Sequence, residues 1–248
     1  KRILSQAARA MAGLVQHEGP TASGDDKPLV AATMFGVTTK CVERAREMLE
    51  RAGYEVLVFH ATGNGGLALE SLIADGLIAG VLDITTTELA DEHVGGFLSA
   101  GPDRLTAAGK AGVPQVVSTG ALDMVNFHAP ETVPAAFKDR LFYKHNANVT
   151  LMRTTPEENA AIGADIGRKV AAATGPVAVL LPKKGVSAID REGQPFDDPR
   201  AREALHRAIR ENARGVEVTE LDLHINDPEF ADAAARRLLD LLKPVRKG

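Results

Sequence analysis

Short runs of apolar residues without polar alternation are the feature that most restricts the fold of this chain. Examples are "LVAATMF" (29–35), "IAGVLDI" (78–84) and "GPVAVLLP" (175–182). A strand that is apolar on both sides must be buried on both faces, which is typical of parallel sheets. Amphipathic segments separate these runs. The order predicts an α/β fold: a doubly wound, mainly parallel sheet with helices on both faces, in a Rossmann-like three-layer arrangement.

Four further runs complete the predicted sheet, and three helix starts are signalled beside them. The runs are "YEVLVFH" (54–60), "PQVVST" (114–119), "NVTLMRT" (148–154) and "VEVTELDLHI" (216–225). Thr155 with Pro156 and Glu158 has the pattern of an N-cap, an N1 proline and a capping-box glutamate. Asp198 and Asp227 each precede a proline that opens a helix.

The chain divides into two parts. Residues 1–28 are predicted to form an amino-terminal helix and a polar linker, and residues 29–248 an α/β ligand-binding domain. The helix has an apolar face, which must be covered by something. We expect it to pack on a preceding domain that this chain lacks or on a second copy of the chain, and we expect a homodimer.

Composition argues against several classes of partner. The 248 residues carry a net charge of -4 and only 4% aromatic residues, so nucleic acid and anionic membrane surfaces are not expected partners. Cys41 is the only cysteine, which excludes an intrachain disulfide. The sequence therefore suggests a cytoplasmic protein that acts on small molecules.

In parallel sheets, ligands bind outside the carboxyl ends of the strands, and the glycine-rich exit "HATGNGG" (60–66) lies at such an end. A loop of this kind before a helix can hold a phosphate through backbone N–H groups. Its residues Thr62, Gly63, Gly65 and Gly66 are therefore candidates for ligand binding, although a tight turn explains the glycines equally well. His60 is a candidate acid or base, or alternatively a core histidine.

The exit "DITTTELADE" (83–92) carries more polar residues than a helix start needs. Thr85 and Glu88 match a capping box. Asp83, at the end of an apolar strand, has no such explanation and is predicted to be catalytic. Thr85, Thr86, Thr87 and Glu88 are predicted to contact the ligand. The acids of this segment could also collect Mg²⁺, but their spacing does not demand it.

The remaining exits supply further candidates. Ser118, Gly120 and Asp123 lie in "STGALDMVNF" (118–127), which lacks the G-x-S-x-G pattern of a serine hydrolase. Asp123 could hold a ligand or cap a loop. Arg153 could clamp an anion or form a structural ion pair. Thr38 lies in the exit "FGVTTKC" (35–41) and is a further candidate for ligand binding. Cys41, in the same exit, could be an activated thiol or a buried packing residue.

Taken together, these exits resemble a known family. The motifs are "MFGVTT", "GYEVLVFHATGNGG", "GVLDITTTELADEHVGG", "AGPDRLTAAGKAGVPQVVSTGALDMVNF", "HNANVTLMRTTPEE" and "HINDPEF". They are similar to bacterial and fungal proteins related to the tomato mosaic virus resistance protein, often labelled ATP-binding, over about residues 29 to 242. The resemblance implies that the chain is the carboxyl-terminal of two α/β domains. It implies no established reaction, and the nucleotide label belongs mainly to the preceding domain.

Two functions remain in competition. The first is the ligand-binding domain of a metabolic enzyme that acts on a small anionic, phosphorylated or nucleotide compound, with ATP or Mg²⁺ possible but not required. The second is a non-catalytic module that binds a nucleotide or metabolite and works through protein contacts. Turnover of a substrate without added cofactor would separate them.

Overall fold

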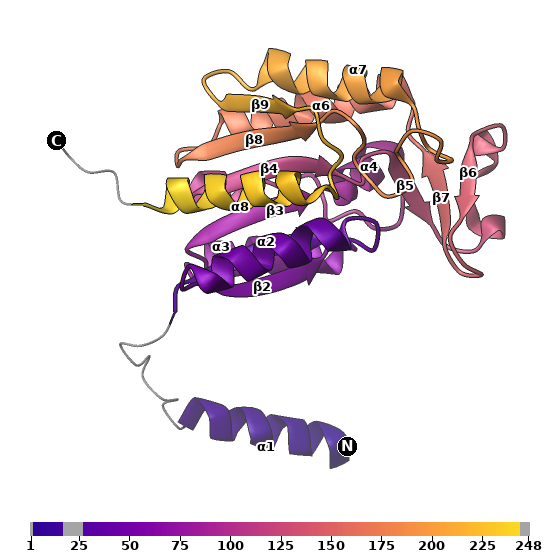
Figure 1. Cartoon of the computed structure of the whole chain (residues 1–248). Helices are drawn as coiled ribbons and strands as arrows, with labels where there is room; N and C mark the ends of the chain where they lie inside the picture. Colours follow the sequence, from indigo (N-terminus) through magenta and orange to yellow (C-terminus); the bar gives the residue numbers. More distant parts are fainter. Residues whose placement is uncertain (1, 17–26, 244–248) are drawn as a thin grey trace.

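The computed structural model describes residues 2–16 and 27–243. Its centre is a parallel sheet of six strands in the order β2-β1-β3-β4-β8-β9 (Figure 1). The strands are β1 (Leu29–Met34), β2 (Glu55–His60), β3 (Gly80–Thr85), β4 (Gln115–Gly120), β8 (Val177–Pro182) and β9 (Glu217–Leu221). The order of strand addition reverses at β1, because β2 lies on one side of it and β3 on the other.

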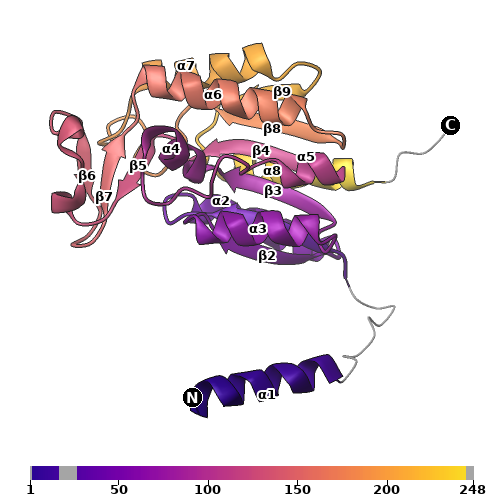
Figure 2. The same cartoon turned by 180° about the vertical axis from the view of Figure 1, so that it is seen from behind.

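Helices cover both faces of this sheet, as the apolar strands require. α2 (Thr39–Arg51) and α8 (Pro228–Leu242) lie on one face (Figure 1). The other face carries α3 (Asn64–Ala74), α4 (Thr87–Val94), α5 (Ala107–Ala111), α6 (Pro156–Ala171) and α7 (Pro199–Asn212) (Figure 2). Successive residues of β1 enter different cores: Val30 and Ala32 pack with α2 and α8, while Ala31 packs with α3. The predicted doubly wound α/β fold is confirmed.

One predicted strand does not belong to the parallel sheet. Segment 148–154 forms β7 (Thr150–Arg153), which pairs antiparallel with β5 (Met124–Phe127) and β6 (Phe142–Lys144) in a separate sheet. Two short 3₁₀ helices, η1 (Pro130–Thr132) and η2 (Ala135–Phe137), lie between β5 and β6. The small sheet stands beyond the carboxyl ends of the parallel strands (Figure 1). The error arose because β5 and β6 carry no strong strand pattern.

The three predicted helix starts are present. Thr155 and Glu158 form a reciprocal capping box at α6, and the Asp198 carboxylate accepts from the N–H groups of Arg200 and Ala201 at α7. Asp227 is the N-cap of α8. Its carboxylate accepts from the N–H of His224 instead of a helical N–H, and so tightens the turn before the helix.

The amino-terminal helix is α1 (Arg2–Gln16), drawn apart from the sheet in Figure 1. Its Ile3, Leu4 and Met11 are exposed. Most of the predicted linker, residues 17–26, lies outside the described residues. Within the described ranges, every helix is too short or too polar to cross a membrane.

Candidate functional site

The structure brings the predicted exits to one edge of the sheet. His60 ends β2, Asp83 lies two residues before the end of β3, and Ser118 lies two residues before the end of β4. β2 and β3 flank β1, where the order of strand addition reverses, and β4 lies next to β3. Ligands bind near such reversal points in open α/β sheets. Most of the predicted side chains are nevertheless buried against one another, and only some of them reach a cavity.

Asp83 takes part in a buried ionic cluster with Arg104. The guanidinium of Arg104, which is completely buried, donates to both Asp83 carboxylate oxygens at 2.6 and 2.7 Å and to Glu88 at 2.7 Å. Thr33 donates a further hydrogen bond to Asp83 at 2.8 Å. Since Asp83 is 2% exposed and fully engaged, the structure does not support the predicted catalytic role. The contacts that Asp83 makes are those of a buried ion pair.

The N–H groups of the glycine-rich loop bind an anionic group of the protein itself, the carboxylate of Glu88. The N–H groups of Gly63 and Gly66 donate to one carboxylate oxygen of Glu88, at 2.7 and 2.9 Å. The amino terminus of α3 is thus neutralised by an internal carboxylate. Burial raises the pKa of Glu88, while Arg104 opposes that effect. The geometry therefore gives no support to ligand binding by Gly63, Gly66 or Glu88.

The predicted capping box at Thr85 and Glu88 is wrong. α4 starts one residue later, with Thr86 as its N-cap, and its start has no side-chain cap. Thr85 remains in β3, where its hydroxyl lies 2.8 Å from the hydroxyl of Thr38 and donates to the carbonyl of Thr33. The capping-box pattern gave the wrong prediction because the Glu88 carboxylate accepts hydrogen bonds from Arg104 and from the N–H groups of Gly63 and Gly66 instead.

The other small polar residues join neighbouring strand ends. The Thr86 hydroxyl donates to the Ser118 carbonyl at 3.0 Å, and the Ser118 hydroxyl donates to the Leu180 carbonyl at 2.8 Å. The Gly120 carbonyl accepts from the N–H of Thr86. The Thr87 hydroxyl accepts from the Asn126 side chain at 3.4 Å. These contacts hold β3, β4 and β8 together and leave the hydroxyls without access to a ligand.

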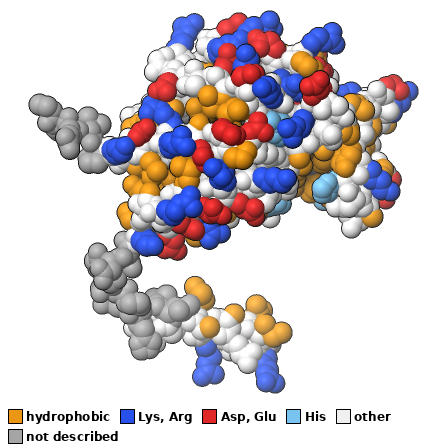
Figure 3. Space-filling view, in the orientation of Figure 1, with side chains coloured by type: hydrophobic (Ala, Val, Ile, Leu, Met, Phe, Trp, Pro, Cys, Tyr) orange, Lys and Arg blue, Asp and Glu red, His pale blue; other side chains and the backbone are white. Residues whose placement is uncertain are grey.

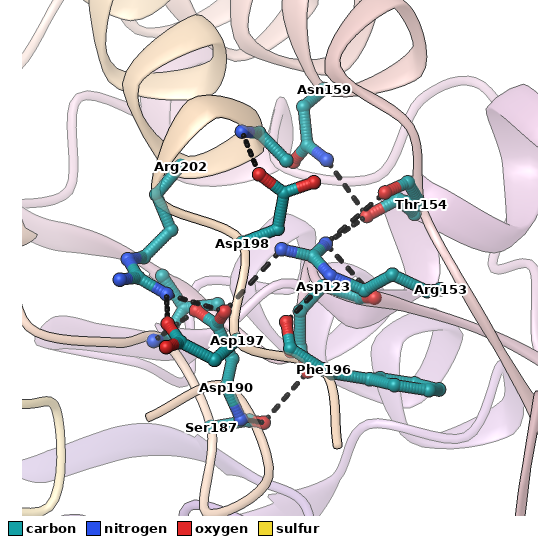
Figure 4. A network of polar contacts seen from close by, with 12 residues as sticks. Asp123, Arg153, Thr154, Asn159, Ser187, Asp190, Phe196, Asp197, Asp198 and Arg202 are labelled. Atoms are coloured by element: carbon teal, nitrogen blue, oxygen red, sulfur yellow. Dashed lines mark hydrogen bonds and ion pairs between the residues drawn. The ribbon is translucent and has the colours of Figure 1, made fainter. Parts of the chain in front are cut away.

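A second buried network surrounds Arg153 (Figure 4). Its guanidinium donates to the Phe196 carbonyl at 2.8 Å, to the Thr154 hydroxyl at 2.8 Å and to Asp190 at 3.3 Å. Asp190 also accepts from Arg202 at 2.6 Å. Arg153 is 6% exposed, so it forms the structural ion pair that was the alternative to an anion clamp.

Asp123 lies in the same network and is incompletely satisfied. One carboxylate oxygen accepts from the Ser187 hydroxyl at 2.8 Å, while the other is buried with no hydrogen-bond partner in the described part of the chain. Burial, with the neighbouring charge of Asp190, raises the pKa of Asp123 to about 7. Ala121, two residues earlier, has a φ of 57°, a value that costs a residue with a side chain free energy.

An apolar cavity of about 370 Å³ lies between the main sheet and the small one. His60 and Thr62 line it, so these are the predicted side chains that reach a cavity. Burial lowers the pKa of His60, which favours the neutral imidazole at neutral pH. The remaining lining residues come from the β1–α2 loop, the segment after α4 and the β6–β7 hairpin: Phe35, Gly36, Val37, Phe97, Leu98, His145, Asn146, Val149 and Leu151.

A second cavity, of about 610 Å³, lies against the first turn of α2, and we call it the α2 cavity. It is lined by Gly36, Val37, Thr39, Lys40, Ala188, Arg191, Gln194, His224 and Asn226. His224 is buried and both of its ring nitrogens are engaged: Nε2 lies 2.8 Å from the Ser187 carbonyl and Nδ1 3.1 Å from the Asn226 N–H. This lining contains two cationic side chains and no carboxylate.

Two chemical alternatives can be judged from the same geometry. Cys41 is buried, and burial raises its pKa to about 12, so the alternative of a packing residue applies. Over residues 2–16 and 27–243, no group of three or more histidine, cysteine or acidic side chains has the geometry of a metal site. The acids considered for Mg²⁺ are occupied: Asp83 and Glu88 by Arg104, and Asp91 by Asn126 and Leu98.

Sequence reasoning missed the residues that organise these sites. Arg104 sits in the polar segment "GPDRLT", which reads as an exposed loop, and nothing local marks its burial. Lys40 and Arg191 are ordinary charged residues until the fold places them on one cavity. The available signal for Lys40 was its position in the first turn of a helix that contains no early acid.

Comparison with known proteins identifies the family. The model of the uncharacterised protein family UPF0261, C-terminal domain, matches residues 27–242. The chain belongs to this family. A UPF0261 protein of Clostridium tetani is 55% identical over 244 residues, 98% of this chain and 60% of that protein. The ToMV resistance protein Tm-1(GCR237) of Solanum lycopersicum is 46% identical over 248 residues, 97% of this chain and 33% of that protein.

These matches confirm the resemblance at the level of the family. The ToMV susceptible protein tm-1(GCR26) is 44% identical over 248 residues, 97% of this chain and 33% of that protein. This chain therefore spans about three fifths of the length of the Clostridium relative and about one third of the length of the tomato relatives. None of these names states a ligand or a reaction, and the ATP-binding label stays a prediction.

Proposed function

We propose that this UPF0261 domain binds a small anionic compound, such as a phosphorylated metabolite or a nucleotide, as the ligand-binding part of a metabolic enzyme. One observation carries the proposal. The amino terminus of α2 opens on a cavity that contains Lys40 and Arg191 and no carboxylate. That cavity lies beside β1, the strand at which the strand order reverses, and ligands bind near such strands in open α/β sheets.

The argument depends on a contrast between two helix starts. At α3 the Glu88 carboxylate already receives the loop N–H groups. At α2 the first turn has no acidic residue, and the N–H groups of Thr39 and Lys40 donate to no acceptor within the described ranges. Free N–H groups and the helix dipole both favour an anion at such a position.

The charges beside α2 support the same conclusion. Among the described residues, Lys40 and Arg191 take part in no ion pair, whereas the neighbouring Lys184 pairs with Asp222 and Arg202 with Asp190. An uncompensated pair of cations at the end of a cavity favours binding of an anion over a neutral ligand. His60, which lines the other cavity and whose pKa is lowered by burial, is our candidate for proton transfer if the domain is catalytic.

Titration with ligands tests the proposal. Inorganic phosphate, then a panel of phosphate esters, sugar acids and nucleotides, is titrated into the protein by calorimetry. Lys40→Gln and Arg191→Gln are each expected to weaken binding at least about tenfold, because each removes a charge-assisted hydrogen bond. Lys110→Gln is the control, since Lys110 is exposed and lines neither cavity. Equal affinities for parent and both variants would refute the α2 cavity as the anion site.

Turnover decides between the two functional classes. An enzyme should convert at least one compound that binds, and His60→Gln should slow this conversion more than it weakens binding. Binding without conversion of any panel member would favour the non-catalytic module.

The exposed Ile3, Leu4 and Met11 of α1 favour a role for protein contacts in either case. Sedimentation measurements on the parent and on an Ile3→Ser, Leu4→Ser, Met11→Ser variant test our expectation of a homodimer. A monomeric parent would contradict it.

A further inference from the structure

The apolar cavity and the α2 cavity share one wall. Gly36 and Val37, in the loop between β1 and α2, line both of them. The two cavities differ sharply in chemistry: the α2 cavity carries Lys40 and Arg191, whereas no lysine, arginine, aspartate or glutamate lines the apolar one. A ligand that extended over this loop would contact cationic side chains in the α2 cavity and apolar side chains in the other cavity.

Gly36 contributes no side chain to the wall that the two cavities share. A Cβ added at this position would meet no atom within 4 Å, and its φ is not in the left-handed region. Neither backbone strain nor close packing therefore explains the glycine, in contrast to Gly65, whose added Cβ would overlap the His60 carbonyl. The absent side chain leaves open space beside a loop that lines both cavities.

The apolar cavity suits the body of a small organic molecule. Its volume of about 370 Å³ lies within the range of pockets that enclose small ligands. Phe35 and Phe97 bound it, and Val149 and Leu151 close it from the small sheet. Figure 3 shows hydrophobic side chains gathered beside the three-stranded sheet, with histidine side chains at their border. Burial lowers the pKa of His60, which favours the uncharged form of this side chain at neutral pH.

We propose that the ligand of this domain is an amphiphilic organic anion whose charged group lies in the α2 cavity and whose uncharged apolar body crosses Gly36 into the apolar cavity. This inference rests on the proposed function and narrows its substrate class. It favours monoesters and acids with one charged end and a short alkyl or aromatic body. Compounds with charges at both ends are disfavoured, because the second charge would be desolvated without a partner.

A homologous series of n-alkyl phosphates tests the inference, since the charged group stays constant while the apolar body grows. Ethyl, butyl and hexyl phosphate are titrated by calorimetry into the full chain. Each buried methylene should tighten binding about threefold to fourfold. Phe97→Ala removes an exposed wall of the cavity, and Val149→Thr adds a hydroxyl to it at constant shape. Both variants should reduce the dependence on chain length and leave ethyl phosphate affinity within about twofold.

Two further variants complete the design. Gly36→Val should lose the gain in affinity from longer chains, because its side chain occupies the space beside the shared loop. Gly36 also lines the α2 cavity, so the affinities of this variant for butyl and hexyl phosphate are compared with its own affinity for ethyl phosphate. Val58→Thr is the matched control for Val149→Thr, since Val58 is 37% exposed on β2 and lines neither cavity. It should behave as the parent.

The possible outcomes separate the two proposals. If ethyl phosphate binds and Lys40→Gln weakens it, but chain length has no effect, the present inference is overturned and the proposed function stands. If chain length matters equally in the parent and in the Phe97, Val149 and Gly36 variants, the apolar body binds elsewhere and the inference is again overturned. If no alkyl phosphate binds, the present inference is overturned, while the proposed function fails only if no phosphate ester, sugar acid or nucleotide of the wider panel binds either.

Discussion

The replacement of Arg104 by methionine is the perturbation for which the structure gives the clearest expectation. Methionine approximates the length and apolar stem of the arginine but donates no hydrogen bond. The change leaves Asp83, which is 2% exposed, and Glu88, which is fully buried, without their cation. Removal of one partner from a buried ion pair typically costs about 3 to 5 kcal/mol, and here two carboxylates lose their partner. We therefore expect a loss of about 5 kcal/mol in the free energy of unfolding.

Urea unfolding measures this loss. The slope of the unfolding free energy against urea concentration shows whether the variant also changes the surface that is exposed on unfolding. Arg46→Met is the matched control, because Arg46 pairs with Glu50 on the surface of α2, where the two side chains are 50% and 40% exposed. Such exposed pairs contribute about 0 to 1 kcal/mol.

A double variant isolates the charge interaction from lost packing. In the Arg104→Met background, Asp83→Asn removes one uncompensated charge, so it should destabilise the protein less than it does in the parent, or even stabilise it. The difference should be at least about 1 kcal/mol, in the range found for residues in direct contact. A loss below about 1 kcal/mol for Arg104→Met, or strictly additive effects, would refute a charge-compensating role for Arg104.

Three other expectations follow from single contacts. Gly65→Ala should destabilise the protein by about 1 to 3 kcal/mol, because the new Cβ overlaps the His60 carbonyl. Gly36→Ala should change the free energy of unfolding by less than about 1 kcal/mol, because its Cβ would meet no atom within 4 Å. Urea unfolding of both variants compares these effects. Cys41 should resist thiol reagents in the native protein and react once unfolded, and rapid labelling of the folded protein would contradict its burial. Burial raises the pKa of Asp91 from 3.8 to about 7, so its contribution to stability should be present below pH 3.8 and be lost as the pH rises through about 7. Urea unfolding across this range should show a weaker loss in Asp91→Asn, and an equal loss would exclude Asp91 as its source.

The sequence sufficed for the parallel sheet because that prediction depends on local patterns. β1, β3 and β8 are apolar at consecutive positions, and only burial on both faces accommodates such strands. The capping box of Thr155 is likewise local, since all of its partners lie within one helical turn. β7 was placed in the wrong sheet because its partners, β5 and β6, are short strands that only the tertiary structure defines.

The candidate site was harder to predict, because the sequence shows which residues lie near the sheet edge but not which partners they choose. Glu88 has the spacing of a cap, yet Arg104, 16 residues away, and the glycine loop, more than 20 residues away, compete for its carboxylate. Asp83 is an unexplained acid until Arg104 is placed beside it. The sequence likewise does not reveal that no carboxylate accepts from the N–H groups at the start of α2, whereas Glu88 accepts from those at the start of α3, among the described residues.

The small sheet also has a consequence for how the domain can diversify. Phe127 and Thr150 pair directly across β5 and β7, so residues 128–149 leave and re-enter the fold at neighbouring points. This segment supplies His145, Asn146 and Val149 to the apolar cavity, while Lys40 and Arg191 come from the main scaffold. Under the binding mode proposed above, a transplanted hairpin of different length or composition would change which apolar bodies are accepted and leave the contacts to the charged group unchanged.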